Sequence, residues 1–217
     1  MPRRHQPVLA NDRSQRHGLG DLLQRKLYQV DVNSMACTST TFAEDLADMN
    51  ELSIGFSMDG PGATTESLFL ASGKYLGASG TMSIAKLDQT TMAATHLGAL
   101  DGPVALTGTG SGELWAWYHP PSLADLEIEP RIALIDKASG SELKTFDLGE
   151  LGAGDYVLGA FAFWGGDFWL FSRDDTAETS YVFQVDGATG AIKDTVPSPY
   201  YAIMGAGVST CAPLVIL

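Results

Sequence analysis

Two segments of this chain place carboxylates close to aromatic or cationic side chains, a pattern that can bind a cation, a sugar or a basic peptide. Each segment lies beside the second strand of a repeated unit described below, so we expect the two to form neighbouring loops on one face. Solvated loops that bind nothing are the alternative interpretation of the same pattern. The candidate binding residues are Trp117, His119, Asp125, Glu127, Arg173, Asp174 and Asp175.

Catalytic and metal-binding motifs are not recognised elsewhere in the sequence. The four histidines are scattered, and no pair has the H-x-x-x-H spacing of a metal site. The run 108–112 is rich in glycine but leads into a strand, so it lacks the helix N-terminus that binds phosphate. Residues 59–66 contain oxygen ligands without the spacing of a calcium loop, and a hairpin turn is the favoured interpretation. We therefore predict no catalytic residue, no metal site and no cofactor.

A unit of about fifty residues recurs along the chain, marked by a strand, a turn that begins with Asp, and another strand. The successive aspartates are 57, 48 and 50 residues apart. Several short strands per unit and a period in this range predict the blades of a β-propeller. Because Asp can accept hydrogen bonds from turn N–H groups, we interpret these residues as turn caps rather than as a catalytic set. They are Asp31, Asp88, Asp136 and Asp186.

Three complete blades of four antiparallel strands are predicted between residues 52 and 196. Strands rich in small residues are expected at the propeller axis, and strands carrying bulky side chains are expected to fill the wedges between blades. The expected strands are 52–58, 67–72, 82–88 and 94–100 in the first blade, 104–110, 113–119, 131–136 and 142–148 in the second, and 157–164, 167–172, 181–186 and 191–196 in the third.

The two ends of the chain suggest a split, incomplete fourth blade. Residues 202–210 are expected to form its inner strand, and residues 26–42 its two outer strands, but no second strand is recognised before residue 26. A blade that lacks this strand would leave exposed sheet edges, which favour association with another chain. We expect a single propeller-like domain over 26–217. The basic segment 1–25 is either a natural disordered tail or the product of a shifted reading frame.

The overall composition restricts the class of partner. The net charge is −13, and clustered Lys and Arg for phosphate contacts are missing, so nucleic acid is not expected as a partner. Apolar residues make up 45 %, but no apolar run reaches the eighteen or so residues needed for a membrane-spanning helix. The basic start of the chain has no apolar core of the kind found in signal peptides.

Several stretches resemble a group of propeller-like proteins of myxobacteria. They include AFAFWGGDFWLF at 160–171 and GAGVSTCAP at 205–213, and the similarity covers roughly residues 26–217. The resemblance implies an exported or lipoprotein-type parent with a longer N-terminus and about six blades, acting in the periplasm or outside the cell. It brings no activity, cofactor or catalytic residue with it. Whether Cys37 and Cys211 form a disulfide is left open by the sequence.

The function expected from these features is non-catalytic binding of an unknown protein or glycan by a propeller module. A carbohydrate-active hydrolase or lyase with carboxylates near the axis is one alternative. A vestigial fragment of a larger propeller is another, because one strand of the fourth blade is not recognised.

Overall fold

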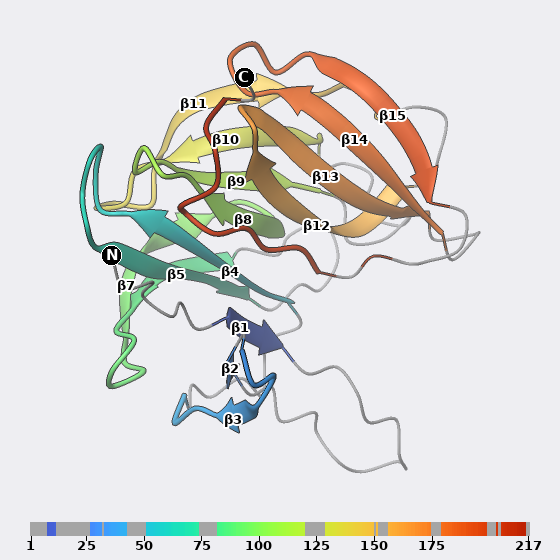
Figure 1. Ribbon diagram of the computed structural model, residues 1–217. Helices are drawn as coiled ribbons and strands as arrows, with labels where there is room; N and C mark the ends of the chain where they lie inside the picture. The colour runs from blue at the N-terminus through green and yellow to red at the C-terminus, as the bar shows by residue number, and fades with distance from the viewer. Residues whose placement is uncertain are drawn as a thin grey trace, which may run out of the picture.

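The computed structural model of the protein consists of β-strands arranged in separate sheets (Figure 1). Three of these sheets each contain four antiparallel strands that follow one another in chain order. No helix in the described part of the chain is long and apolar enough to span a membrane. The structure describes residues 8–11, 27–31, 33–42, 51–73, 82–119, 129–149, 151, 156–174, 179–198, 203 and 205–215.

Each four-stranded sheet corresponds to one predicted blade, so the expected propeller-like architecture is confirmed. The strand ends lie within a few residues of those predicted. The first blade contains β4 (Glu51–Met58), β5 (Glu66–Gly73), β6 (Met82–Leu87) and β7 (Ala94–Leu100). The second contains β8 (Val104–Gly108), β9 (Leu114–Tyr118), β10 (Arg131–Ile135) and β11 (Glu142–Asp147). The third contains β12 (Tyr156–Trp164), β13 (Asp167–Asp174), β14 (Ser180–Asp186) and β15 (Ile192–Ser198).

The first strand of every blade lies innermost, where neighbouring blades approach each other most closely. Strand β8 lies beside both β4 and β12, and the blades follow one another along an arc (Figure 1). At Gly108 an added Cβ would lie 1.9 Å from the carbonyl oxygen of Phe56, so a side chain cannot be accommodated there. This close approach explains the small residues expected near the axis.

Bulky side chains fill the wedges between consecutive sheets. We call the face of a sheet that packs against the next sheet in the chain its forward face, and the opposite face its back face. The forward face of the second blade buries Trp115, Trp117 and Ile132 against the back face of the third. That back face contributes Phe168 and Leu170. The wedges hold the main hydrophobic core, as the sequence predicts.

The three blades share one strand register. Leu68 pairs with Leu87 in the first blade, Leu114 with Ile135 in the second, and Phe168 with Val185 in the third. Side chains alternate between the two faces of a strand, so residues at equivalent positions point the same way in every blade. The equivalent forward-facing positions next to these pairs hold Phe69, Trp115 and Trp169.

The recurring aspartates cap the turns between the last two strands of each unit, as predicted. In the third blade the Asp186 carboxylate accepts hydrogen bonds from the backbone N–H groups of Ala188, at 3.0 Å, and Thr189, at 2.9 Å. All four turns place one residue at positive φ. Two of them use Gly140 and Gly190, whereas Met35 and Met92 occupy this position in the other two. The sequence pattern had indicated only glycine for this role.

The N-terminal sheet corrects the expectation that one strand is missing before residue 26. Strand β1 (Val8–Asn11) pairs antiparallel with β2 (Leu27–Val30), which pairs with β3 (Cys37–Ser39). Strand β1 is only four residues long and lies farther upstream than residues 16–25, where the repeat predicts the missing strand, so its sequence pattern is not distinctive. On the forward face of this sheet, Leu27 is fully buried against the first blade.

The C-terminal segment, residues 203 and 205–215, is not the inner strand predicted over 202–210. None of its described residues is assigned to a strand, so the N-terminal sheet has no inner strand among the described residues. The segment instead crosses the first turns of the blades. Pro213 accepts a 2.9 Å hydrogen bond from the backbone of Gly165, and Thr210 donates a 2.6 Å hydrogen bond to Glu66. Bonds to these turns replace pairing within a sheet.

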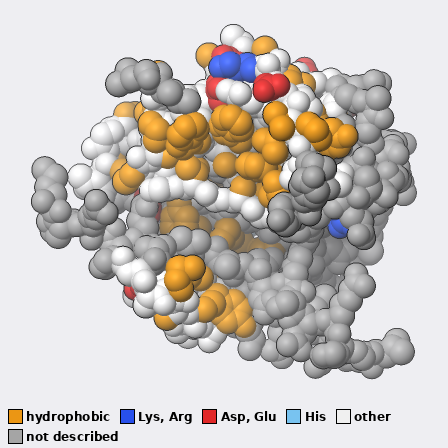
Figure 2. Space-filling model, turned by 45° about the vertical axis from the view of Figure 1, so that its right-hand side comes forward, with side chains coloured by type: hydrophobic (Ala, Val, Ile, Leu, Met, Phe, Trp, Pro, Cys, Tyr) orange, Lys and Arg blue, Asp and Glu red, His pale blue; other side chains and the backbone are white. Residues whose placement is uncertain are grey.

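Among the described residues, no strand joins the two ends of the arc. No hydrophobic cluster of the described residues joins the third blade to the N-terminal sheet. Figure 2 views the arc with the third blade turned forward and shows hydrophobic side chains gathered over that blade. Cys37 and Cys211 are both exposed free thiols in this arrangement.

Candidate functional site

A pocket of about 590 Å³ opens between the first and second blades, at the end where the hairpin turns lie. Its apolar wall includes Phe69 from β5, Leu134 and Ile135 from β10, and Leu143 from β11. The hairpin turn that begins at Asp59 and the turn that begins at Asp136 close two of its sides. The remaining lining residues are Ser67, Lys86, Gly112, Glu113, Lys137 and Ala138.

Lys137 joins the two blades at the base of the pocket. Its ammonium group donates hydrogen bonds to the carbonyl oxygens of Met58, at 2.7 Å, and Asp59, at 3.3 Å. Burial lowers the pKa of Lys137, while Asp59 acts in the opposite direction and Lys86 adds to the lowering. Because its donors are used by the first blade, Lys137 serves mainly to hold the pocket in shape.

Asp59 anchors the first hairpin turn of the first blade. Its two carboxylate oxygens accept hydrogen bonds from the hydroxyls of Thr65 and Ser67, both at 2.5 Å. These hydrogen bonds hold the pKa of Asp59 below its usual value, and the bond from Ser67 has the largest effect. The positive charges of Lys86 and Lys137 lower the pKa further. The segment 59–66 is thus a hairpin turn, as predicted, whose carboxylate is occupied by its own chain.

Lys86 is the cation of the pocket that is left available. It lies on β6, is exposed, and makes no hydrogen bond or ion pair within the described part of the chain. Its ammonium group can donate up to three hydrogen bonds. A ligand in the pocket could therefore place a carboxylate, phosphate or hydroxyl group near Lys86 and an apolar group against Leu143, which is 63 % exposed.

The predicted aromatic binding residues lie inside the molecule. Trp117 is fully buried in the wedge between the second and third blades, and His119, 4 % exposed, lies with its ring centre 5.0 Å from that of Trp117. Two buried polar atoms, Nε1 of Trp117 and Oγ of Ser172 on β13, have no hydrogen-bond partner among the described residues. Trp117 thus contributes to the core between blades.

Of the cationic and acidic candidates, only Arg173 and Asp174 lie within the described residues. Arg173 follows Ser172 on β13 and so points to the opposite face of the third blade, with its Nε buried and unpaired among the described residues. Asp174 ends the same strand. Asp125, Glu127 and Asp175 lie outside the described residues. The structure thus brings together Trp117 and His119, and a binding role for the seven residues stays a prediction.

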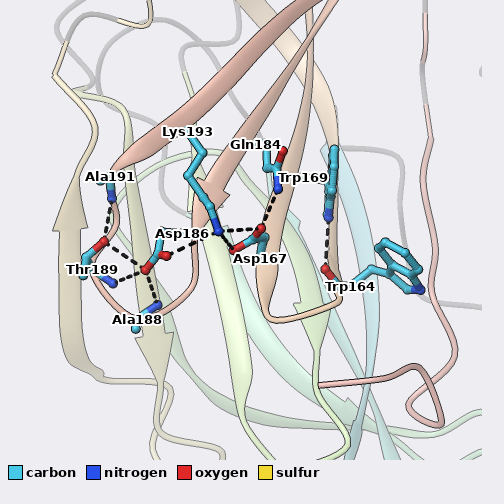
Figure 3. A network of polar contacts seen from close by, with 9 residues as sticks. All are labelled: Trp164, Asp167, Trp169, Gln184, Asp186, Ala188, Thr189, Ala191 and Lys193. Atoms are coloured by element: carbon cyan, nitrogen blue, oxygen red, sulfur yellow. Dashed lines mark hydrogen bonds and ion pairs between the residues drawn. The ribbon is translucent and has the colours of Figure 1, made fainter. Parts of the chain in front are cut away.

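A second polar cluster lies on the third blade (Figure 3). Asp167, only 6 % exposed, accepts a 2.6 Å hydrogen bond from Gln184 and pairs with Lys193 at 2.9 Å. Its neighbours Trp164 and Trp169 are linked by a 3.1 Å hydrogen bond from the indole of Trp169 to the carbonyl oxygen of Trp164. The carboxylate and amide of this cluster already satisfy one another, so it stabilises strand ends.

Sequence reasoning missed the pocket between the first two blades. The signal that could have revealed it is Lys86, a cation at a forward-facing position where the second blade has Leu134 and the third has Gln184. A charged residue that interrupts an apolar, wedge-facing pattern indicates that the wedge is open to solvent at that point.

No family model matches the chain, and no curated protein matches it significantly. Among solved structures, it is similar to an exo-β-1,3-galactanase from Phanerochaete chrysosporium in complex with galactose, with a TM-score of 0.52 and 10 % identity over 88 % of this chain. It is also similar to an engineered GH43 glycoside hydrolase with endo-xylanase and exo-arabinofuranosidase activity, with a TM-score of 0.50 and 8 % identity over 81 % of this chain.

The chain spans less than half of these structures, 47 % of the galactanase and 37 % of the hydrolase. At such low identity the likeness concerns the fold, which is that of part of a β-propeller.

Proposed function

We propose that the protein is a non-catalytic binding module that recognises a protein or glycan ligand through the pocket between its first and second blades. The observation that supports this proposal is the pocket itself, which combines an apolar wall with one available ammonium group. Ligand sites are commonly concave and apolar, with a few polar groups that fix orientation. Hydrogen bonds of Lys137 and Asp59 hold the base of the pocket in place, while the side chains of Lys86 and Leu143 remain accessible to a ligand.

The carbohydrate-active alternative is less well supported by the inner strands. Glycoside hydrolysis in most families requires two carboxylates, about 5 to 10 Å apart, flanking the bond to be cleaved. Within the described residues of β4, β8 and β12, Glu51 is the only acidic residue. A pair of carboxylates at the axis therefore cannot be assembled from these strands, which favours binding over hydrolysis.

The resemblance to exported propeller proteins supports a location outside the cytoplasm. Fractionation of the producing cells, followed by immunodetection of the protein, checks this part of the proposal. Recovery in the cytoplasmic fraction alone would contradict it.

Binding can be tested by screening the purified protein against glycan and peptide arrays and measuring the affinity of each hit by calorimetry. Lys86→Ala is expected to weaken binding by about tenfold or more, because hydrogen bonds to charged groups contribute about 1.5 to 3 kcal/mol. Leu143→Ala should also weaken it through lost apolar contact. Lys144→Ala removes the same charge from β11 outside the pocket lining and serves as the matched control.

Two results would overturn the proposed site. One is the absence of any hit on either array. The other is a hit whose affinity is the same for Lys86→Ala, Leu143→Ala and the Lys144→Ala control.

A further inference from the structure

The forward face of the third blade carries apolar side chains like those of a buried wedge, beside the polar Arg173 and Gln184, but no sheet of the described residues packs against it. In the second blade the equivalent face buries Trp115, Trp117, Ile132 and Phe146, each no more than 9 % exposed. Strand pairing fixes the equivalent positions in the third blade, because Phe171 pairs with Val182, and Val182 with Val196. We define the open face as Trp164, Trp169, Phe171, Val182 and Val196.

The exposure of these residues differs sharply from that of their equivalents. Val196 is 51 % exposed, whereas the equivalent Phe146 is 9 % exposed. Trp164 at the end of β12 is 43 % exposed, and Trp169, Phe171 and Val182 are half-buried. The C-terminal segment passes this blade, where Ile203 donates a 2.7 Å hydrogen bond to Ser180, but it leaves the outer strands uncovered. Figure 2 shows hydrophobic side chains gathered over this part of the molecule.

The chain itself shows what packs on a forward face. The N-terminal sheet packs its forward face on the back face of the first blade, the first blade on the second, and the second on the third. In all three cases the occupant is the back face of another sheet of this chain. Packing of two forward faces against each other occurs in none of them.

At the other end of the arc, no sheet of the described residues packs on the back face of the N-terminal sheet. In β2 the side chain of Leu27 points to the first blade. Because side chains alternate along a strand, Tyr28 and Val30 both point to the opposite face, which is the back face of this sheet. Both are only half-buried. The two open surfaces are therefore the two halves of the forward-on-back contact that the chain uses three times. Neither surface belongs to a hydrophobic cluster of the described residues.

We propose that the open face of the third blade packs against the back face of the N-terminal sheet of a second copy of this chain. The contact is head to tail, so two copies can close a ring or several can extend into a chain of copies. Large aromatic and aliphatic side chains would leave water in the same way as in the internal wedges. This inference concerns residues other than those that line the proposed ligand pocket and does not depend on that pocket.

The mass of the protein in solution tests the proposal. Size-exclusion chromatography with light scattering should give at least twice the 23.0 kDa mass of one chain at micromolar concentration and above. Val196→Asp should produce monomers, because it places a charge in the open face. The matched control is Thr195→Asp, which adds the same charge at the residue just before Val196 in β15. Thr195 is exposed like Val196, but its side chain points to the other face of the sheet. The control should keep the wild-type mass.

A second variant distinguishes the head-to-tail contact from other arrangements. Val30→Asp alters the back face of the N-terminal sheet and should also give monomers. An equimolar mixture of Val196→Asp and Val30→Asp should restore a dimer, because the intact open face of one variant meets the intact back face of the other. Circular dichroism and thermal unfolding of each variant verify that it is folded.

Three results would overturn the proposal. The first is a wild-type monomer at every concentration tested. The second is a Val30→Asp variant with wild-type mass beside a monomeric Val196→Asp variant, which indicates that two open faces meet each other. The third is a mixture of the two variants that remains monomeric.

Discussion

The aspartates that open the outer turns act as acceptors for backbone N–H groups that would otherwise face solvent. The Asp88 carboxylate, for example, lies 2.9 Å from the amide nitrogen of Thr90 and 2.7 Å from that of Thr91. These hydrogen bonds to the ionised form keep the pKa values of Asp88, Asp136 and Asp186 below the usual value. Each turn is thus stabilised more strongly when its carboxylate is charged than when it is protonated.

This dependence predicts a specific response to acid. A carboxyl group whose pKa is lower in the folded state stabilises the fold above its unfolded pKa, about 4, and this contribution disappears as the pH falls through the folded pKa. A variant with Asp88→Asn, Asp136→Asn and Asp186→Asn keeps the acceptor oxygen but cannot titrate. Urea unfolding at pH 7 and pH 3 should show a smaller loss of stability for this variant than for the wild type. Equal losses would contradict the assigned role of the three carboxylates.

The residue at positive φ in each outer turn shows what the sequence could and could not indicate. Gly140 and Gly190 follow the familiar preference, because glycine adopts this conformation without steric cost. Met35 and Met92 occupy the same position at φ 57° and 59°. Turns with methionine there were still recognised, since the aspartate and the flanking strands carry the pattern. Local propensity alone would have missed them.

Among the structural elements, the inner strands impose the tightest steric requirement. Strands β4 and β8 approach so closely at Gly108 that an added methyl group would overlap the carbonyl group of Phe56. Backbone atoms of an inner strand cannot move aside without displacing the blade to which they belong. The hub of the arc therefore tolerates less variation than the outer turns.

Gly108→Ala should accordingly lower the free energy of unfolding by about 3 kcal/mol or more, at the upper end of what overpacking usually costs. Gly60→Ala is the matched control, because nothing lies within 4 Å of an added Cβ at Gly60. The control should stay within about 0.5 kcal/mol of the wild type, as is usual for substitutions at the surface. Urea denaturation measures both. Equal stabilities for the two variants would show that β4 and β8 are not packed as described.

The blades could be predicted from sequence because their signals are local and repeated. Alternating apolar residues, glycine-containing hairpins and turn aspartates recur in all three complete blades, so an error in one copy is corrected by the others. Strand β1 has no distinctive sequence pattern, because it is short and occurs once. The C-terminal segment was predicted wrongly because its position depends on contacts with the distant residues Glu66 and Gly165. The pocket was missed for the same reason, since Lys86 and Lys137 meet only when two blades pack.

The predicted loop residues show a related limit. Trp117 and Arg173 lie in neighbouring blades, and sequence alone suggested that they share one surface. Side-chain alternation instead directs Trp117 into a wedge and Arg173 to the far face of the third blade. Which face a residue occupies depends on register, and register is set by the complete sheet.

Considered as a whole, the molecule combines open apolar ends with a strong negative charge. Each chain carries a net charge of −13, so two copies that associate repel each other over long distances. Added salt shortens the range of this repulsion from about 30 Å at 0.01 M to about 10 Å at 0.1 M. Contacts between apolar faces are little weakened by the same change.

The proposed assembly should therefore strengthen with ionic strength. Sedimentation equilibrium in increasing sodium chloride is expected to give a dissociation constant that falls as salt is added. Trp169 and Val196 would then remain in contact with the second copy of the chain, while salt screens the repulsion between the acidic surfaces of the two copies. A dissociation constant that rises with salt would mean that opposite charges hold the copies together instead.

The C-terminal segment also affects how the protein matures. Its residues contact hairpins of all three blades, through Thr210 with Glu66 and Gly110, and through Pro213 with Gly165. Each blade can form on the ribosome once its own four strands have emerged, but this strap follows every blade in the chain. During synthesis the nascent blades are therefore held together only by the packing in their wedges. The C-terminal segment can contact the three hairpins only after all three blades have been translated.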